Sequence, residues 1–223
     1  MVRITHTHVV VLLHGIGHTS LNMRSMERAL KRQGYSTLNI TYPSCRMCIQ
    51  DLARYLADRL AHENIWDGRY PTVDFVTHSM GGLVVQQYLE DFREDVPSGR
   101  LGRVVMLAPP QHGSEVADFL QHFPPYKWVF GPAGQELTTA RRQACPIQPY
   151  YELGIIAGDK GWPYFVAHFL FRERHDGRVA VSKTRKAGMK SHVILHCTHG
   201  FISWNNATHM HVLHFLNRGE FIV

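Results

Sequence analysis

The stretch VDFVTHSMGG, residues 73–82, decides the fold. Residues 73–76 form a mostly apolar β-type run, and residues 80–92 carry apolar side chains at helical spacing. Ser79 therefore lies where a strand ends and a helix begins, and the small residues Gly81 and Gly82 let that helix pack closely. A serine that merely caps a helix is the alternative. The context is typical of a nucleophile elbow, which lifts a serine hydroxyl over a sheet edge.

Short β-type runs and amphipathic helical stretches alternate on both sides of this turn. We expect strands at 9–13, 38–42, 73–77, 104–107, 154–157, 178–181 and 193–195, and helices near 23–34, 49–60, 80–92 and 207–216. Such alternation predicts an α/β protein with a parallel sheet and helices on both of its faces.

A second glycine-bearing turn, HGIGH at residues 14–18, directly follows the first strand. Neighbouring parallel strands end at the same sheet edge, so this turn should meet the Ser79 turn and present a backbone N–H beside it. A plain strand-to-helix turn with two glycines is the alternative. The turn is no dinucleotide fingerprint, because Ser20 stands where the third glycine is needed.

The strand and helix rhythm breaks between residues 112 and 150, which hold several prolines and many aromatic residues. We expect this part to be an insertion over the carboxyl edge of the sheet, where ligands bind in open α/β sheets. Its aromatic residues, among them Phe119, Phe123 and Trp128, could wall an acyl-chain pocket or form a small core beneath a loop. Both readings stay open.

Together these motifs resemble the α/β-hydrolase fold of lipases and esterases. The resemblance rests on LLHGIG at 12–17 and THSMGG at 77–82. It extends to the small bacterial triacylglycerol-lipase-like esterases through residues 108–110, 113–114, 176–179 and 199–202. It implies one domain over residues 1–223, with a cap-like insertion at about 112–150. Only eight residues precede the first strand, so we expect a reduced, mostly parallel sheet of about six strands.

The resemblance implies a Ser-Asp-His triad in that chain order. Ser79 would be the nucleophile, Asp176 the orienting acid and His199 the base, with the backbone N–H groups of Ile16 and Met80 as the oxyanion hole. Substrate contacts are expected from His14, Gly15, Phe119, Phe123 and Trp128. Asp159 competes with Asp176 for the acid, and His196, His209, His211 and His214 compete for the base. Thr77 departs from the family pattern, which has glycine there.

The function implied is cleavage of carboxylic esters, as by an esterase or lipase, through an acyl-enzyme. Acyl-thioesterase activity uses the same residues, and a catalytically inactive ligand-binding protein of this fold is a further alternative. We expect no cofactor and no metal, because the lone pair Cys45 and Cys48 lacks the second pair that a zinc site needs. The expected partner is a small-molecule ester or lipid.

The composition agrees with a globular protein and excludes other classes. The chain has 223 residues, with 44% hydrophobic and 19% charged residues and a net charge of +6. No basic stripe or motif predicts nucleic-acid binding, and no run approaches the roughly 18 apolar residues that span a bilayer. Four cysteines are too few for a disulfide scaffold, so we expect a cytoplasmic protein. The pattern does not indicate the oligomeric state.

Overall fold

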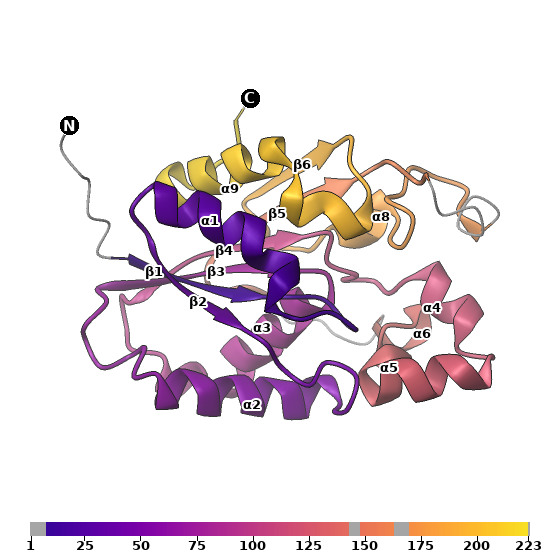
Figure 1. The fold of residues 1–223 in the computed structure, drawn as a ribbon, viewed down its shortest axis with the longest axis horizontal. Coiled ribbons are helices and arrows are strands. Elements are labelled where there is room, and N and C mark those ends of the chain that lie inside the picture. The colour runs from indigo at the N-terminus through magenta and orange to yellow at the C-terminus, as the bar shows by residue number, and fades with distance from the viewer. Residues whose placement is uncertain (1–7, 143–147, 163–169, 223) are drawn as a thin grey trace.

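A computed structural model describes residues 8–142, 148–162 and 170–222 (Figure 1). Within them, one sheet contains β1 (His8–Leu13), β2 (Ser36–Ile40), β3 (Thr72–His78), β4 (Leu101–Leu107), β5 (Glu152–Gly158) and β6 (Ser191–Leu195). The strand order is β2-β1-β3-β4-β5-β6, and every neighbouring pair is parallel. The predicted parallel sheet of about six strands is therefore confirmed.

Helices cover both faces of this sheet, as predicted. The first layer contains α2 (Ile49–His62) and α3 (Met80–Asp91), and the second contains α1 (Arg24–Arg32) and α9 (Asn206–Arg218). Successive side chains of β1 point to opposite faces of the sheet and belong to two separate cores. Val9 and Val11 pack with the first layer, and Val10 and Leu12 pack with the second. None of the helices in the described parts of the chain is long and apolar enough to cross a membrane.

The segment predicted to be an irregular insertion contains three helices in its described part. They are α4 (Glu115–Leu120), α5 (Pro124–Glu136) and α6 (Thr139–Arg142), and we call residues 112–142 the cap segment. Ser114 caps α4, since its side chain accepts the N–H of Ala117. Pro132 and a kink at Gly131 interrupt α5, which explains why no regular period is visible in the sequence. The cap segment lies beyond the carboxyl ends of the strands (Figure 1).

The strand predicted at residues 178–181 is wrong. Outside the named strands, the pairing there is a single antiparallel bridge between His175 and Ala180, and the chain continues into α8 (Val181–Thr184). Val179 and Val181 are both buried, as their alternation suggested, but by a turn instead of a sheet. That turn forms because the Asp176 carboxylate accepts the N–H groups of Arg178 and Val179.

The start of α3 lies against the end of β1 at an unusually short distance. A β-carbon built on Gly81 would lie 2.6 Å from the carbonyl oxygen of His14 and 2.9 Å from that of Leu13. Both neighbours are backbone atoms, which cannot rotate away as a flexible side chain can. Glycine at this position therefore sets how closely the Ser79 turn approaches the turn after β1.

We predict that Gly81→Ala lowers the free energy of unfolding by about 1–3 kcal/mol, the usual cost of overpacking. The sign is informative, because glycine to alanine inside a helix ordinarily stabilises it by about 1 kcal/mol. Urea denaturation measures the change. Glu90→Ala, at an exposed position of the same helix, is the control. Equal or greater stability of Gly81→Ala would show that the two elements can separate without loss.

Candidate active site

Ser79 occupies a strained bend between β3 and α3. Its backbone has φ 53° and ψ −126°, a positive φ that a residue with a side chain seldom adopts. The Ser79 N–H donates to the carbonyl of Leu107 at 2.8 Å, and the Ser79 carbonyl accepts the N–H of Gly82 at 3.0 Å. Thr77, the departure from the family pattern, lies inside β3 and pairs with Leu13 and Met106. The bend therefore forms with a β-branched residue before it.

The side chains of Ser79, His199 and Asp176 form a continuous hydrogen-bonded chain. His199 Nε2 lies 2.9 Å from Ser79 Oγ, and His199 Nδ1 lies 2.7 Å from Asp176 Oδ2. Since a carboxylate only accepts, Nδ1–H donates to Asp176 and Nε2 is left to accept the serine proton. The Asp176 side chain is fully buried, and its second oxygen accepts two backbone N–H groups.

Asp159, the competing acid, lies in a different set of contacts. Its carboxylate pairs with Arg174 and with His196 Nδ1, the latter at 3.0 Å. Burial opposes its ionisation, but these two partners outweigh burial and lower the pKa of Asp159. The structure therefore places Asp176, and not Asp159, on His199.

The competing histidines also lie elsewhere. His196 contacts Asp159, His209 Nε2 lies 2.9 Å from the Ser203 carbonyl, and His214 Nδ1 lies 2.8 Å from the Glu220 carbonyl. His211 packs edge-on against Phe221. Of these candidates, His199 is the one whose ring contacts Ser79.

The turn after β1 meets the Ser79 turn, as the parallel strands require. A β-carbon on Gly15 would lie 3.1 Å from Ser79 Cβ, and Ile16 lines the same cavity as Ser79. Met80, the other predicted oxyanion residue, is the first residue of α3. The site thus places one backbone segment on each side of the serine, with the start of a helix directly after it.

His14, the first residue of this turn, is fully buried. Its Nδ1–H donates to the Gly15 carbonyl at 2.7 Å, its Nε2 accepts the Tyr42 N–H at 3.3 Å, and its ring stacks on Tyr42. Burial lowers the pKa of His14 to about 4, although the bond to Gly15 opposes the shift. His14 therefore holds the turn as a neutral imidazole.

A cavity of about 490 Å³ opens beside Ser79 and His199. Its walls come from the cap segment and from the turns after β1 and around Asp176, and include Val116, Ala117, Phe119, Leu120, Tyr126, Phe130, Leu137 and Val179. Of the aromatic residues predicted to bind substrate, Phe119 lines this cavity and Phe123 packs on Phe119 with rings 5.4 Å apart. Trp128 lies on α5 with 84% of its surface exposed.

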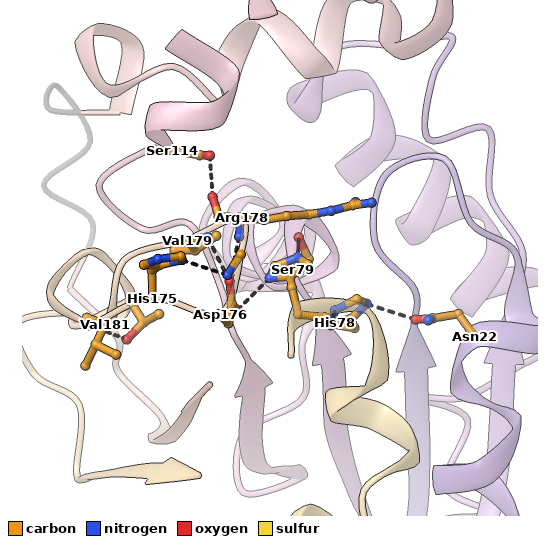
Figure 2. A network of polar contacts seen from close by, with 12 residues as sticks. Asn22, His78, Ser79, Ser114, His175, Asp176, Arg178, Val179 and Val181 are labelled. Carbon is orange, nitrogen blue, oxygen red and sulfur yellow. Dashed lines mark hydrogen bonds and ion pairs between the residues drawn. The ribbon is translucent and has the colours of Figure 1, made fainter. Parts of the chain in front are cut away.

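His78 is a buried residue of the site that the sequence analysis did not single out. Its Nε2 lies 2.9 Å from the carbonyl oxygen of His199, and its Nδ1 lies 2.9 Å from Asn22 Oδ1 (Figure 2). Burial holds the pKa of His78 well below its usual range. The signal for His78 in the sequence was its position directly before Ser79, at the end of the strand that leads into the Ser79 turn.

No group of three metal-ligating side chains occurs among the residues that the structure describes. Cys45, Cys48 and Cys197 are free thiols, and Cys145 lies outside the described residues.

A sequence profile described as the alpha/beta hydrolase family matches residues 10–213. The chain belongs to this family. Members of the fold among solved structures include the mature lipase BlEst2 of Bacillus licheniformis, which is 21% identical with a TM-score of 0.74 over 96% of this chain and 91% of that one. No curated protein sequence matches the chain.

Two further hydrolases superpose on this alpha/beta hydrolase. Phospholipase PlaB of Legionella pneumophila is 20% identical with a TM-score of 0.64, over 80% of this chain and 45% of that one. The metagenomic carboxyl esterase MGS0156 is 16% identical with a TM-score of 0.64, over 88% and 65%. At these identities the likeness shows a shared fold.

The neutral, buried His14 predicts a pH dependence of stability. Its pKa is about 4 in the folded protein and 6.5 when unperturbed, so the unfolded state binds the proton more readily. The stabilisation is complete above pH 6.5 and is lost as the pH falls towards 4. We predict that His14→Gln flattens the decline in unfolding free energy over this interval, measured by urea denaturation. His62→Gln, at an exposed position, is the control, and parallel declines in both variants would contradict the prediction.

Proposed function

We propose that this protein is a serine hydrolase that cleaves carboxylic esters through a covalent acyl-enzyme. In this proposal Ser79 is the nucleophile, His199 the general base and Asp176 the orienting acid. The observation that supports it is the buried hydrogen-bonded chain from Ser79 Oγ through His199 to Asp176, with distances of 2.9 and 2.7 Å. The tautomer that this chain imposes on His199 is the one that can accept the serine proton.

Acylation follows from this arrangement. Ser79 Oγ attacks the ester carbonyl carbon while His199 Nε2 takes the hydroxyl proton, because an unassisted serine hydroxyl is a poor nucleophile. The negative charge that develops on the carbonyl oxygen is stabilised by the N–H groups of Ile16 and Met80, each worth on the order of 3 kcal/mol. When the intermediate collapses, the ester C–O bond breaks and His199 returns the proton to the departing alkoxide, which leaves as an alcohol.

Deacylation repeats these steps with water as the nucleophile. His199 Nε2 removes a proton from a water molecule as its oxygen attacks the acyl carbon, and the Ser79–acyl bond then breaks with the proton returned to Ser79 Oγ. The buried Asp176 carboxylate stabilises the imidazolium that forms in both halves. A carboxylic acid is released and the enzyme is regenerated.

The acyl group is assigned to the apolar cavity of about 490 Å³ beside Ser79. Its walls of Val116, Ala117, Leu120 and Leu137 offer no charge to an acyl chain, and each methylene removed from water there contributes about 0.8 kcal/mol. The substrate is therefore a small-molecule ester or a lipid. Phe119 lines this cavity, and Phe123 packs on the Phe119 ring.

We predict that a fluorophosphonate probe labels the wild-type protein on Ser79 and that Ser79→Ala is neither labelled nor active. Loss of the nucleophile should lower kcat/KM for 4-nitrophenyl esters by about 10⁴-fold or more. Labelling followed by mass spectrometry identifies the modified residue, and Ser98→Ala, at an exposed position, is the control. A matched series of esters and thioesters then separates esterase from thioesterase. A wild type inert to the probe and to both series would instead favour a ligand-binding protein.

We further predict that Asp176→Asn lowers kcat by about 10²–10⁴-fold, because an asparagine amide donates to His199 Nδ1 and imposes the opposite tautomer. Asparagine still offers an oxygen to the two backbone N–H groups, so the turn is preserved. Asp159→Asn is the matched control and should leave kcat within about twofold, since its partners are Arg174 and His196. The reverse result in steady-state kinetics would move the acid to Asp159.

A further inference from the structure

Arg178 lies on the turn that carries Asp176, and its backbone is held at both ends. The Arg178 N–H donates to Asp176 Oδ1 at 2.9 Å, and its carbonyl accepts the Ser114 hydroxyl at 2.6 Å. The side chain is half-buried and lines the same cavity as Ser79 and His199. Figure 2 shows it extending past Ser79, away from Asp176. A turn with a hydrogen-bonded backbone thus places a cationic side chain in the lining of the cavity that contains Ser79.

Arg178 differs in charge from the other residues of the cavity wall. Among the described residues that line the cavity, Arg178 is the one lysine or arginine, and none is an aspartate or glutamate. The remaining wall is apolar over α4 and α5, where Ala117, Leu120 and Phe130 contribute. The cavity lining therefore has two chemically different parts, an apolar wall under the cap segment and the cationic side chain of Arg178.

The charge of Arg178 also reaches other groups around Ser79. Burial lowers the pKa of His18, and the positive charge of Arg178 lowers it further. The His18 ring lies 6.1 Å from the ring of His78, which adjoins His199. Burial raises the pKa of Tyr126 of α5 to about 12, with the charge of Arg178 lowering it and that of Asp118 raising it. The positive charge of Arg178 thus acts on a residue that lines the cavity, Tyr126, and on His18 beside the site.

We propose that Arg178 selects esters that combine an apolar acyl chain with an anionic leaving group. The inference rests on the proposed function. The acyl chain takes the apolar wall and the carbonyl oxygen faces Ile16 and Met80, so the alcohol part remains for Arg178. The planar guanidinium forms paired hydrogen bonds with a phosphate or carboxylate. The phosphate of a lipid headgroup and a soluble organic acid share this chemistry.

Two pairs of octanoyl esters test the proposal, each below its critical micelle concentration. One pair is the octanoyl ester of 4-hydroxybenzoate and that of its methyl ester; the other is 1-octanoylglycerol 3-phosphate and 1-octanoylglycerol. In each pair the first member has an anionic leaving group and the second a neutral one. Each ester is compared between variants, so differences in leaving-group reactivity cancel.

Arg178→Gln should lower kcat/KM for the anionic esters by about tenfold or more and for the neutral esters by less than about twofold. Arg178→Lys should retain part of the preference, because it keeps the charge and loses the fork. Arg172→Gln, an exposed charge-matched control, should change neither. A loss confined to the glycerol phosphate ester identifies a lipid headgroup, and one confined to the benzoate ester identifies a soluble acid.

An equal fall for neutral and anionic esters, or no fall, would overturn the proposal. A binding measurement tests the role of Arg178 without any turnover of substrate. In the Ser79→Ala protein, calorimetry should show that octyl phosphate binds about tenfold more weakly once Arg178→Gln is added, while octanol binding is unchanged. An unchanged dissociation constant for octyl phosphate would reject the role of Arg178, whereas inert wild-type protein with intact binding would reject only the hydrolytic function.

Discussion

The positive-φ bend at Ser79 is the constraint on which the rest of the site depends. Such a conformation costs of order 1–3 kcal/mol in a residue with a side chain, and it persists only between elements that are themselves fixed. The bond from the Ser79 N–H to the Leu107 carbonyl joins it to β4. Gly81 lets α3 lie against the end of β1. Without that approach the serine and the turn after β1 would not share one cavity.

The same sheet edge brings together residues that are far apart in the sequence. The segments at 14–16, 79–80, 176–178 and 199 all follow strands of one parallel sheet, and parallel strands end on one side. Hydrogen bonds then hold them: the His199 N–H donates to the Asp176 carbonyl, and His78 Nε2 lies 2.9 Å from the His199 carbonyl oxygen. His199 is therefore positioned through its main chain as well as its ring.

The carboxylates of Asp176 and Asp159 differ in burial and in the partners that they bind. The Asp176 carboxylate is fully removed from water yet satisfied by His199 and two backbone N–H groups, as a buried charge requires. Asp159 is a carboxylate of the same chain with arginine and histidine partners nearer the surface. The fold alone does not specify a substrate. The substrate proposed above is inferred from the walls of the cavity, which are apolar beneath the cap segment and cationic at Arg178.

The sequence by itself determined the features that are local in the chain. The apolar run before Ser79, the glycines after it and the period of β1 and α2 predicted the sheet, its two helical layers and the meeting of two turns, because backbone conformation and side-chain period are set by near neighbours. Only the tertiary structure decided which carboxylate lies on His199, that His78 adjoins it, and that Arg178 faces the cavity. It also showed that Val179 and Val181 are buried by a turn and not by a strand. The contacts of His199 with Ser79 and His78 join residues 120 and 121 positions apart, and no local sequence pattern encodes contacts over such separations.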